Sequence, residues 1–132
     1  MLYDAKKNAS RYSEIGPIVV EKSAGILFYE QALHLWPDIC MSVFRTPGHS
    51  DDSVCLSLEG ILLTGDTLIK DLRTVTKVKG GSVEKLEHSI AFLESLKGRG
   101  FMVMPGHNEP FPLDGYDLSK ATKKNIKNGN EA

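Results

Sequence analysis

Short apolar runs broken by turns dominate the middle of the chain. Two segments, 39–46 and 53–59, alternate larger apolar residues with smaller or polar ones, which predicts two strands with unlike faces. The run ILLTGD, which ends at Asp66, begins with three consecutive apolar residues and predicts a strand covered on both faces. Residues 17–30 contain the β-rich runs PIVVE and GILFYE, which predict two further strands around a turn, and FMVM at 101–104 predicts a short buried strand.

One segment has helical periodicity. Between Ser82 and Lys97 apolar residues recur at steps of three and four, which predicts a helix over 82–97 with one buried stripe. The stripe consists of Val83, Leu86, Ile90, Leu93 and Leu96. Ser82 is a typical first residue, and Gly98 is a typical stop. Strands followed by a helix and a last strand predict a mixed α+β domain with a mostly antiparallel sheet, of which one helix can cover only one face.

Length and charge limit the classes of protein. At 132 residues the chain is expected to form one domain, 1–117, followed by a polar, flexible, lysine-containing tail over 118–132. The net charge of -1 gives no indication of a nucleic-acid or membrane partner, and neither is expected. No apolar run is long enough to span a membrane, and the start lacks a secretory signal, so a cytoplasmic location is expected.

The candidate chemistry lies at the ends of three apolar runs. TPGHSDD ends in a turn carrying His49, LTGDTL in a turn carrying Asp66, and MPGHNEP in a turn carrying His107. Imidazole nitrogens and carboxylate oxygens are the donors that Zn(II), Fe(II) and Mn(II) use. The spacings of 17 and 41 residues are too long for a local loop site, so these ligands must converge through the fold.

Taken singly, these and neighbouring polar residues have simpler interpretations. A histidine after Pro-Gly, or an aspartate after Gly, is commonly a polar turn residue. Asp51 and Asp52 either cap the next element or act as second-shell partners that orient His49. His34 is interpreted as a structural loop or strand residue, and His88 as part of a solvated helix face.

The three turns together resemble the later motifs of the metallo-β-lactamase superfamily, especially its glyoxalase II-like hydrolases. The resemblance runs from about residue 18 to residue 110 and rests on TPGHSDDSV, LLTGDTL, the helix SVEKLEHSIAFLESL and VMPGHNEP. It implies a four-layer αββα sandwich with a metal site at its edge. In that arrangement His49 completes the first metal site, Asp66 bridges two metals in the catalytic centre, and His107 binds the second metal.

The chain departs from the family pattern near its beginning. Members carry an early His-x-His-x-Asp-His motif, whereas the four histidines here are His34, His49, His88 and His107. Three ligands therefore remain where the pattern uses seven, and the fold is expected to be an incomplete sandwich that begins after that motif. An exposed apolar sheet face would need a cover, so we expect a homo-oligomer or a separate N-terminal half.

The resemblance implies a metal-dependent hydrolase that acts on a small-molecule ester or thioester through a metal-bound hydroxide. One or two zinc ions are implied, and the loop that begins with Lys70, Asp71 and Arg73 would line the mouth of the site. For this chain, activity would require the missing ligands to be supplied. Two alternatives stay open: a non-catalytic truncated domain that acts as an assembly or binding module, and an iron-dependent oxidoreductase of the same fold.

Overall fold

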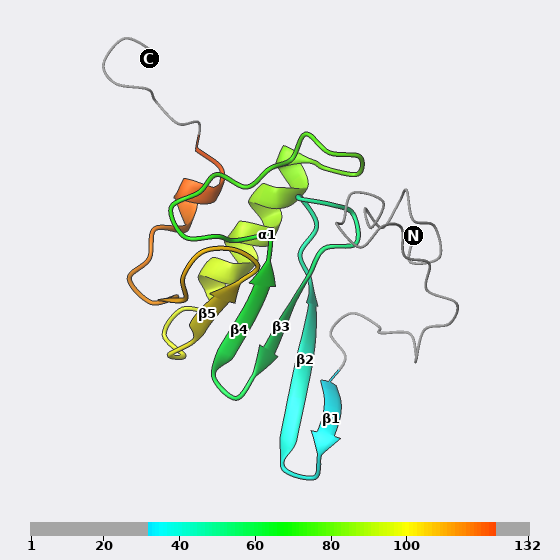
Figure 1. Cartoon of the computed structure of the whole chain (residues 1–132), viewed down its shortest axis with the longest axis vertical. Helices are drawn as coiled ribbons and strands as arrows, with labels where there is room; N and C mark the ends of the chain where they lie inside the picture. The colour runs from blue at the N-terminus through cyan, green and yellow to red at the C-terminus, as the bar shows by residue number, and fades with distance from the viewer. Residues whose placement is uncertain (1–31, 124–132) are drawn as a thin grey trace, which may run out of the picture.

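The structure, a computed structural model, describes residues 32–123. Within them a six-stranded sheet has its strands in the order of the sequence (Figure 1). The strands are β1 (Ala32–Trp36), β2 (Ile39–Arg45), β3 (Val54–Leu58), β4 (Ile61–Gly65), β5 (Met102–Pro105) and β6 (Phe111–Pro112). The strands expected over 17–21 and 25–30 lie outside the described residues.

Neighbouring strands are antiparallel except β4 and β5, which are parallel. The mixed, mostly antiparallel sheet confirms the expected fold class. The hairpin between β3 and β4 turns through Glu59 and Gly60, whose φ values of 49° and 79° suit a two-residue turn between twisted strands. The parallel pair instead needs a long crossover, and the helix α1 (Val83–Ser95) lies within it.

The helix α1 lies slightly inside the expected 82–97 range. Its N-cap Ser82 accepts a hydrogen bond from the backbone N–H of Lys85 at 3.2 Å. Val83, expected in the buried stripe, is 44% exposed. Ser89 lies on the buried side instead, where its hydroxyl donates a hydrogen bond to the carbonyl of Pro47 at 2.6 Å. No helix within residues 32–123 is long and apolar enough to cross a membrane.

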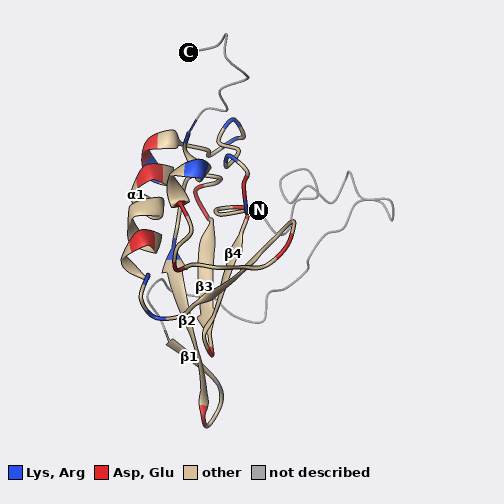
Figure 2. Cartoon of the chain, turned by 90° about the vertical axis from the view of Figure 1, so that its left-hand side faces the viewer, with Lys and Arg blue, Asp and Glu red and all other residues tan. Residues whose placement is uncertain are grey.

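The core lies between the sheet and α1, which runs along one side of the sheet with acidic residues on its outer face (Figure 2). Cys55, Leu62 and Val103 contribute from the strands, and the helix contributes its apolar stripe from Leu86 onward. The short 3₁₀-helix η2 (Leu118–Ala121) adds its two terminal residues to this core. Residues 118–121, assigned to the tail from the sequence, thus pack on the domain, and residues 124–132 lie outside the described range.

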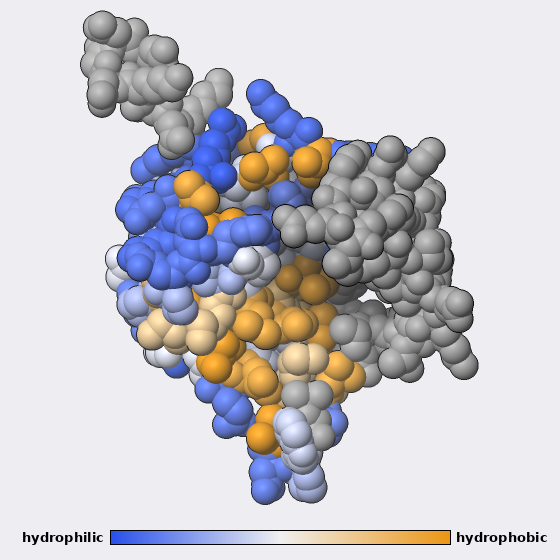
Figure 3. All heavy atoms as spheres, in the orientation of Figure 1, coloured by the Kyte–Doolittle hydropathy of each residue, from blue (hydrophilic) through white to orange (hydrophobic). Residues whose placement is uncertain are grey.

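The sheet face opposite α1 is apolar and partly open. The register pairs Leu56 with Leu63 and Ile61 with Met102, which places these side chains on that face. Leu63 is 37% exposed and Met102 is 40% exposed, and apolar side chains gather over the strands in Figure 3. The prediction that β4 is covered on both faces is therefore wrong for the Leu63 side, since α1 covers only the opposite face.

The two faces of β4 provide a matched pair for a stability test. Leu62→Ala should lower the free energy of unfolding by about 2–5 kcal/mol, because it leaves a cavity under α1. Leu63→Ala, the same change one residue along the strand, should cost less than half as much, because that side chain is partly solvated already. Urea unfolding followed by circular dichroism measures both, and equal losses would mean that the Leu63 face is packed in solution.

Candidate metal centre

Strand direction brings the three candidate turns to one edge of the sheet. Because β3 is antiparallel to both β2 and β4, those two strands run the same way, and β5 runs parallel to β4. Their carboxyl ends therefore lie at the same edge. His49, Asp66 and His107 follow β2, β4 and β5 respectively. The strand order puts Asp66 between the two histidines.

The turn after β2 is packed directly on the helix. Gly48 is buried with φ 147°, and a Cβ built on it would lie 2.5 Å from the Cα of Leu86. Its carbonyl accepts a hydrogen bond from the backbone N–H of Ser82, the N-cap of α1, at 2.9 Å. A glycine is required here by close backbone approach as well as by the backbone angle. The residue after it, His49, is thereby fixed relative to the helix.

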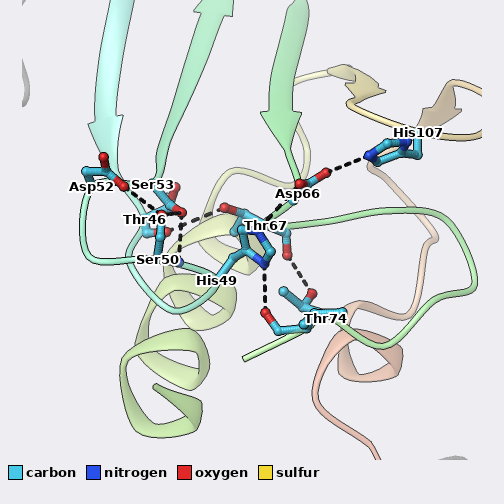
Figure 4. A network of polar contacts seen from close by, with 10 residues as sticks. Thr46, His49, Ser50, Asp52, Ser53, Asp66, Thr67, Thr74 and His107 are labelled. Carbon is cyan, nitrogen blue, oxygen red and sulfur yellow. Dashed lines mark hydrogen bonds and ion pairs between the residues drawn. The ribbon is translucent and has the colours of Figure 1, made fainter. Parts of the chain in front are cut away.

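The two imidazoles approach different oxygens of the same carboxylate (Figure 4). Nε2 of His49 lies 3.5 Å from Oδ2 of Asp66, and Nε2 of His107 lies 3.3 Å from Oδ1. The side chains of His49, Asp66 and His107 are 26%, 40% and 69% exposed. The cluster is therefore a shallow edge site that opens to solvent on the His107 side.

The ring of His49 is oriented by a backbone carbonyl. Its Nδ1 lies 2.7 Å from the carbonyl oxygen of Val75. A carbonyl only accepts, so Nδ1 carries the proton and Nε2 is the nitrogen that faces Asp66. In the neutral ring this sets the Nε2 lone pair against a carboxylate oxygen, and a cation between the two atoms would be attracted by both. Sequence reasoning missed Val75, because a backbone acceptor leaves no side-chain signal.

Two imidazoles with a carboxylate between them are the donor types that a two-metal site uses, but they are too few for a complete metal centre. Gly106 leaves room for the carboxylate, since a Cβ there would lie 3.1 Å from Oδ1 of Asp66. Within residues 32–123, no group of three or more His, Cys, Asp or Glu side chains is arranged to hold a metal ion. Each imidazole lies beside a single oxygen of Asp66, so each side of the carboxylate has one nitrogen and one oxygen donor. Catalytic zinc normally has three protein ligands. The ligand roles of His49, Asp66 and His107 stay predictions.

Asp51 and Asp52, expected either to cap the next element or to orient His49, have other described polar partners. Asp51 forms an ion pair with Lys85 of α1 at 2.7 Å, and this hydrogen bond lowers the pKa of the Asp51 carboxyl. Asp52 accepts a hydrogen bond from the hydroxyl of Ser50 at 2.7 Å. Both carboxylates thus stabilise the turn and its contact with the helix. The described acceptor of the His49 ring is the Val75 carbonyl.

A pocket of about 440 Å³ lies beside the candidate centre, between the loops that follow β4 and β5. It is lined by Lys70, Asp71, Leu72, Asn108 and Glu109. Lys70 and Asp71 of the expected mouth loop line it, whereas Arg73 does not. His34 lies on β1 and His88 on the exposed side of α1, away from the pocket.

Ion pairs fix the walls of this pocket. Lys70 and Glu109 are joined at 2.6 Å, which links the two loops, and this hydrogen bond raises the pKa of Lys70. Asp71 is joined to Lys120 at 2.7 Å, which lowers the pKa of Asp71 and links the first loop to η2. The pocket therefore presents charges of both signs close to His107.

Several solved structures of other proteins have a similar fold. The chain superposes on the BLEG-1 B3 metallo-β-lactamase with a TM-score of 0.72 and 30% identity, over 85% of this chain and 55% of that one. For ETHE1 from Myxococcus xanthus the TM-score is 0.60 at 20% identity, over 83% and 52%. For TTHA1623 in a di-iron-bound form it is 0.62 at 24% identity, over 85% and 55%.

The chain has the metallo-β-lactamase fold, and the solved structures that it matches are members of the metallo-β-lactamase superfamily. It spans about half the length of the solved structures that it matches. No protein-family model and no curated protein matches the sequence.

The Gly48 turn predicts a specific pattern of stability losses. Gly48→Ala should lower the free energy of unfolding by at least about 2 kcal/mol, because the new Cβ meets the Leu86 backbone. Gly60→Ala, at φ 79° in open space, should cost only the left-handed strain of about 1 kcal/mol. Urea midpoints compare the two variants, and similar losses would show that the turn is not seated on α1.

Proposed function

We propose that this chain provides the second half of the metal centre of a metallo-β-lactamase-like hydrolase that acts on a small-molecule ester or thioester. The observation that carries the proposal is the placement of one imidazole on each oxygen of Asp66 at the shared edge of three strands. A carboxylate flanked in this way has the geometry to bridge two cations. The mixed-charge pocket beside His107 is of a size that suits a small molecule.

In this proposal each residue has a separate task. Asp66 would contribute one oxygen to a cation beside His49 and the other to a cation beside His107. The Val75 carbonyl keeps Nε2 of His49 directed at the centre. Bound zinc or iron would supply Lewis acidity and lower the pKa of a coordinated water. The remaining ligands would come from another polypeptide segment.

Two alternatives have support of their own. TTHA1623, one of the fold neighbours, was solved with two irons, which keeps an iron-dependent oxidoreductase in consideration. The small number of donors within residues 32–123 favours a non-catalytic assembly or binding module. Elemental analysis of the purified protein separates iron from zinc, and hydrolysis of p-nitrophenyl acetate and of an acetyl thioester tests the reaction.

Metal titration tests the proposed ligands directly. The chain should bind Zn²⁺ weakly in isothermal titration calorimetry, because few protein donors are present. Asp66→Asn and His107→Gln should each weaken binding by at least roughly 10-fold. His88→Gln, which removes an exposed imidazole from α1, should leave the affinity unchanged. Equal affinities in all four proteins would remove the candidate centre and favour the binding module.

We further propose that the apolar sheet face packs against a second copy of this chain. One chain supplies a helix layer and a sheet layer within the described residues, so two copies related by a twofold axis would form four layers, α-β-β-α. Isologous packing would bury the exposed Leu63 and Met102 in both copies. A separate N-terminal half is the other cover that the sequence suggested.

Light scattering after size exclusion tests this association. The chain should elute as a dimer at micromolar concentration, and Leu63→Glu should shift it to a monomer because it puts a charge on the sheet face. Val83→Glu changes a similarly exposed residue on α1 and should remain dimeric. A monomeric parent chain would overturn self-association. Complex formation only with an added N-terminal half would identify that half as the cover.

A further inference from the structure

The segment that carries Val75 is anchored by its neighbour, Thr74. The side chain of Val75 is 56% exposed, so its own packing cannot fix its carbonyl. Thr74 is buried, and its hydroxyl donates to the carbonyl of Thr67 at 2.8 Å. Its backbone N–H donates to the carbonyl of Ala121 at 2.9 Å. One residue thus joins the turn of Asp66 to the end of η2.

These bonds form a continuous path to His49. Thr67 directly follows Asp66, and its own hydroxyl lies 3.5 Å from the carbonyl of Thr46, in the turn that carries His49. Thr74 holds the next residue, Val75, whose carbonyl accepts from Nδ1 of His49 at 2.7 Å. Figure 4 shows Thr67, Thr74 and His49 grouped beneath Asp66. The path runs through buried hydroxyls and backbone groups, which have few alternative partners.

We propose that Thr74 is the positioning residue of the centre: it holds the Val75 carbonyl so that His49 keeps its proton on Nδ1 and turns Nε2 toward Asp66. Without the Thr74 hydroxyl, the 72–76 segment loses its bond to the Asp66 turn. The Val75 carbonyl is then free to move away from the ring. The imidazole of His49 then loses the acceptor that holds its proton on Nδ1, and the Asp66 oxygen 3.5 Å from Nε2 competes for the proton.

The proposal also assigns a role to the C-terminal segment. Because the Thr74 N–H is bonded to Ala121, η2 supports the orientation of His49 although it contributes no ligand. The ion pair between Asp71 and Lys120 is a second link between the same loop and η2. The consequence for metal binding rests on the proposed function, whereas the consequence for the tautomer does not.

The first test is the tautomer of His49 in the metal-free full chain. Long-range ¹H–¹⁵N spectra, recorded where the imidazoles are neutral, should show the Nδ1–H form, with signals assigned by their loss in His49→Gln. Thr74→Val should give a mixture of tautomers, and Thr74→Ser should restore the Nδ1–H form. A mixture or an Nε2–H form in the parent chain overturns the proposal without any variant, as does an unchanged tautomer in Thr74→Val.

Thr64→Val is the matched control. It also removes a buried hydroxyl, one that donates to the carbonyl of Leu68 at 2.7 Å and does not lead to Val75. It should reduce stability, as Thr74→Val does, and leave the His49 tautomer unchanged. A tautomer change in both variants would show a general structural effect and contradict the specific role of Thr74.

Zn²⁺ titration of the same proteins provides the second arm. Thr74→Val should weaken binding by roughly 10-fold or more, as loss of an outer-shell partner does, while Thr74→Ser and Thr64→Val stay close to the parent chain. If the parent chain binds no Zn²⁺ but shows the expected tautomer pattern, the metal proposal fails and the positioning role stands. If Zn²⁺ binds equally to all variants, the positioning role has no effect on the centre and is overturned.

Discussion

The common direction of β2, β4 and β5 is the constraint on which the candidate centre depends. Neighbouring strands lie about 4.8 Å apart, so the ends of β2 and β4 are separated by about 10 Å and those of β4 and β5 by half as much. A carboxylate on the middle strand can then meet an imidazole from each side, as Asp66 does. Reversing any one strand would send its turn to the opposite edge. The parallel β4–β5 pair requires a crossover through α1, so the helix is part of the same constraint.

Much of the sheet and helix could be predicted from sequence, because each rests on local periodicity and turn residues. The Pro-Gly and Thr-Gly turns likewise indicated His49, Asp66 and His107. Predictions that depended on contacts between distant segments were less successful. The exposure of Leu63 on a strand expected to be covered on both faces, the burial of Leu118 and the acceptor at Val75 follow from how elements pack, and these residues lack a local pattern that distinguishes them. The nearby Asp51 and Asp52 were plausible partners for His49 by proximity alone, but their side chains pair with Lys85 and Ser50.

The shortage of ligands and the open sheet face are two aspects of one arrangement. Both occur where the described residues supply a single sheet with a helix on one face. The apolar side of that sheet meets solvent at Leu63 and Met102. Within residues 32–123, the donors described at its edge come from the turns that follow the strands of this sheet. A second layer packed on the face would bury the apolar surface and would also bring new side chains to that edge. Whichever polypeptide provides that layer therefore decides whether the centre can be catalytic.

The two proposed cation positions differ in how far the protein prepares them. On the His49 side the ring is bound to a carbonyl, the turn is seated on α1, and the layer beneath contains buried threonine hydroxyls. On the other side His107 is 69% exposed, and its described polar partner is Asp66 itself. A ligand that is already oriented loses little conformational freedom on binding, whereas an exposed one must be ordered at that moment. The position beside His49 should therefore bind a cation first, and the position beside His107 should depend more strongly on the ligands that a completing segment brings.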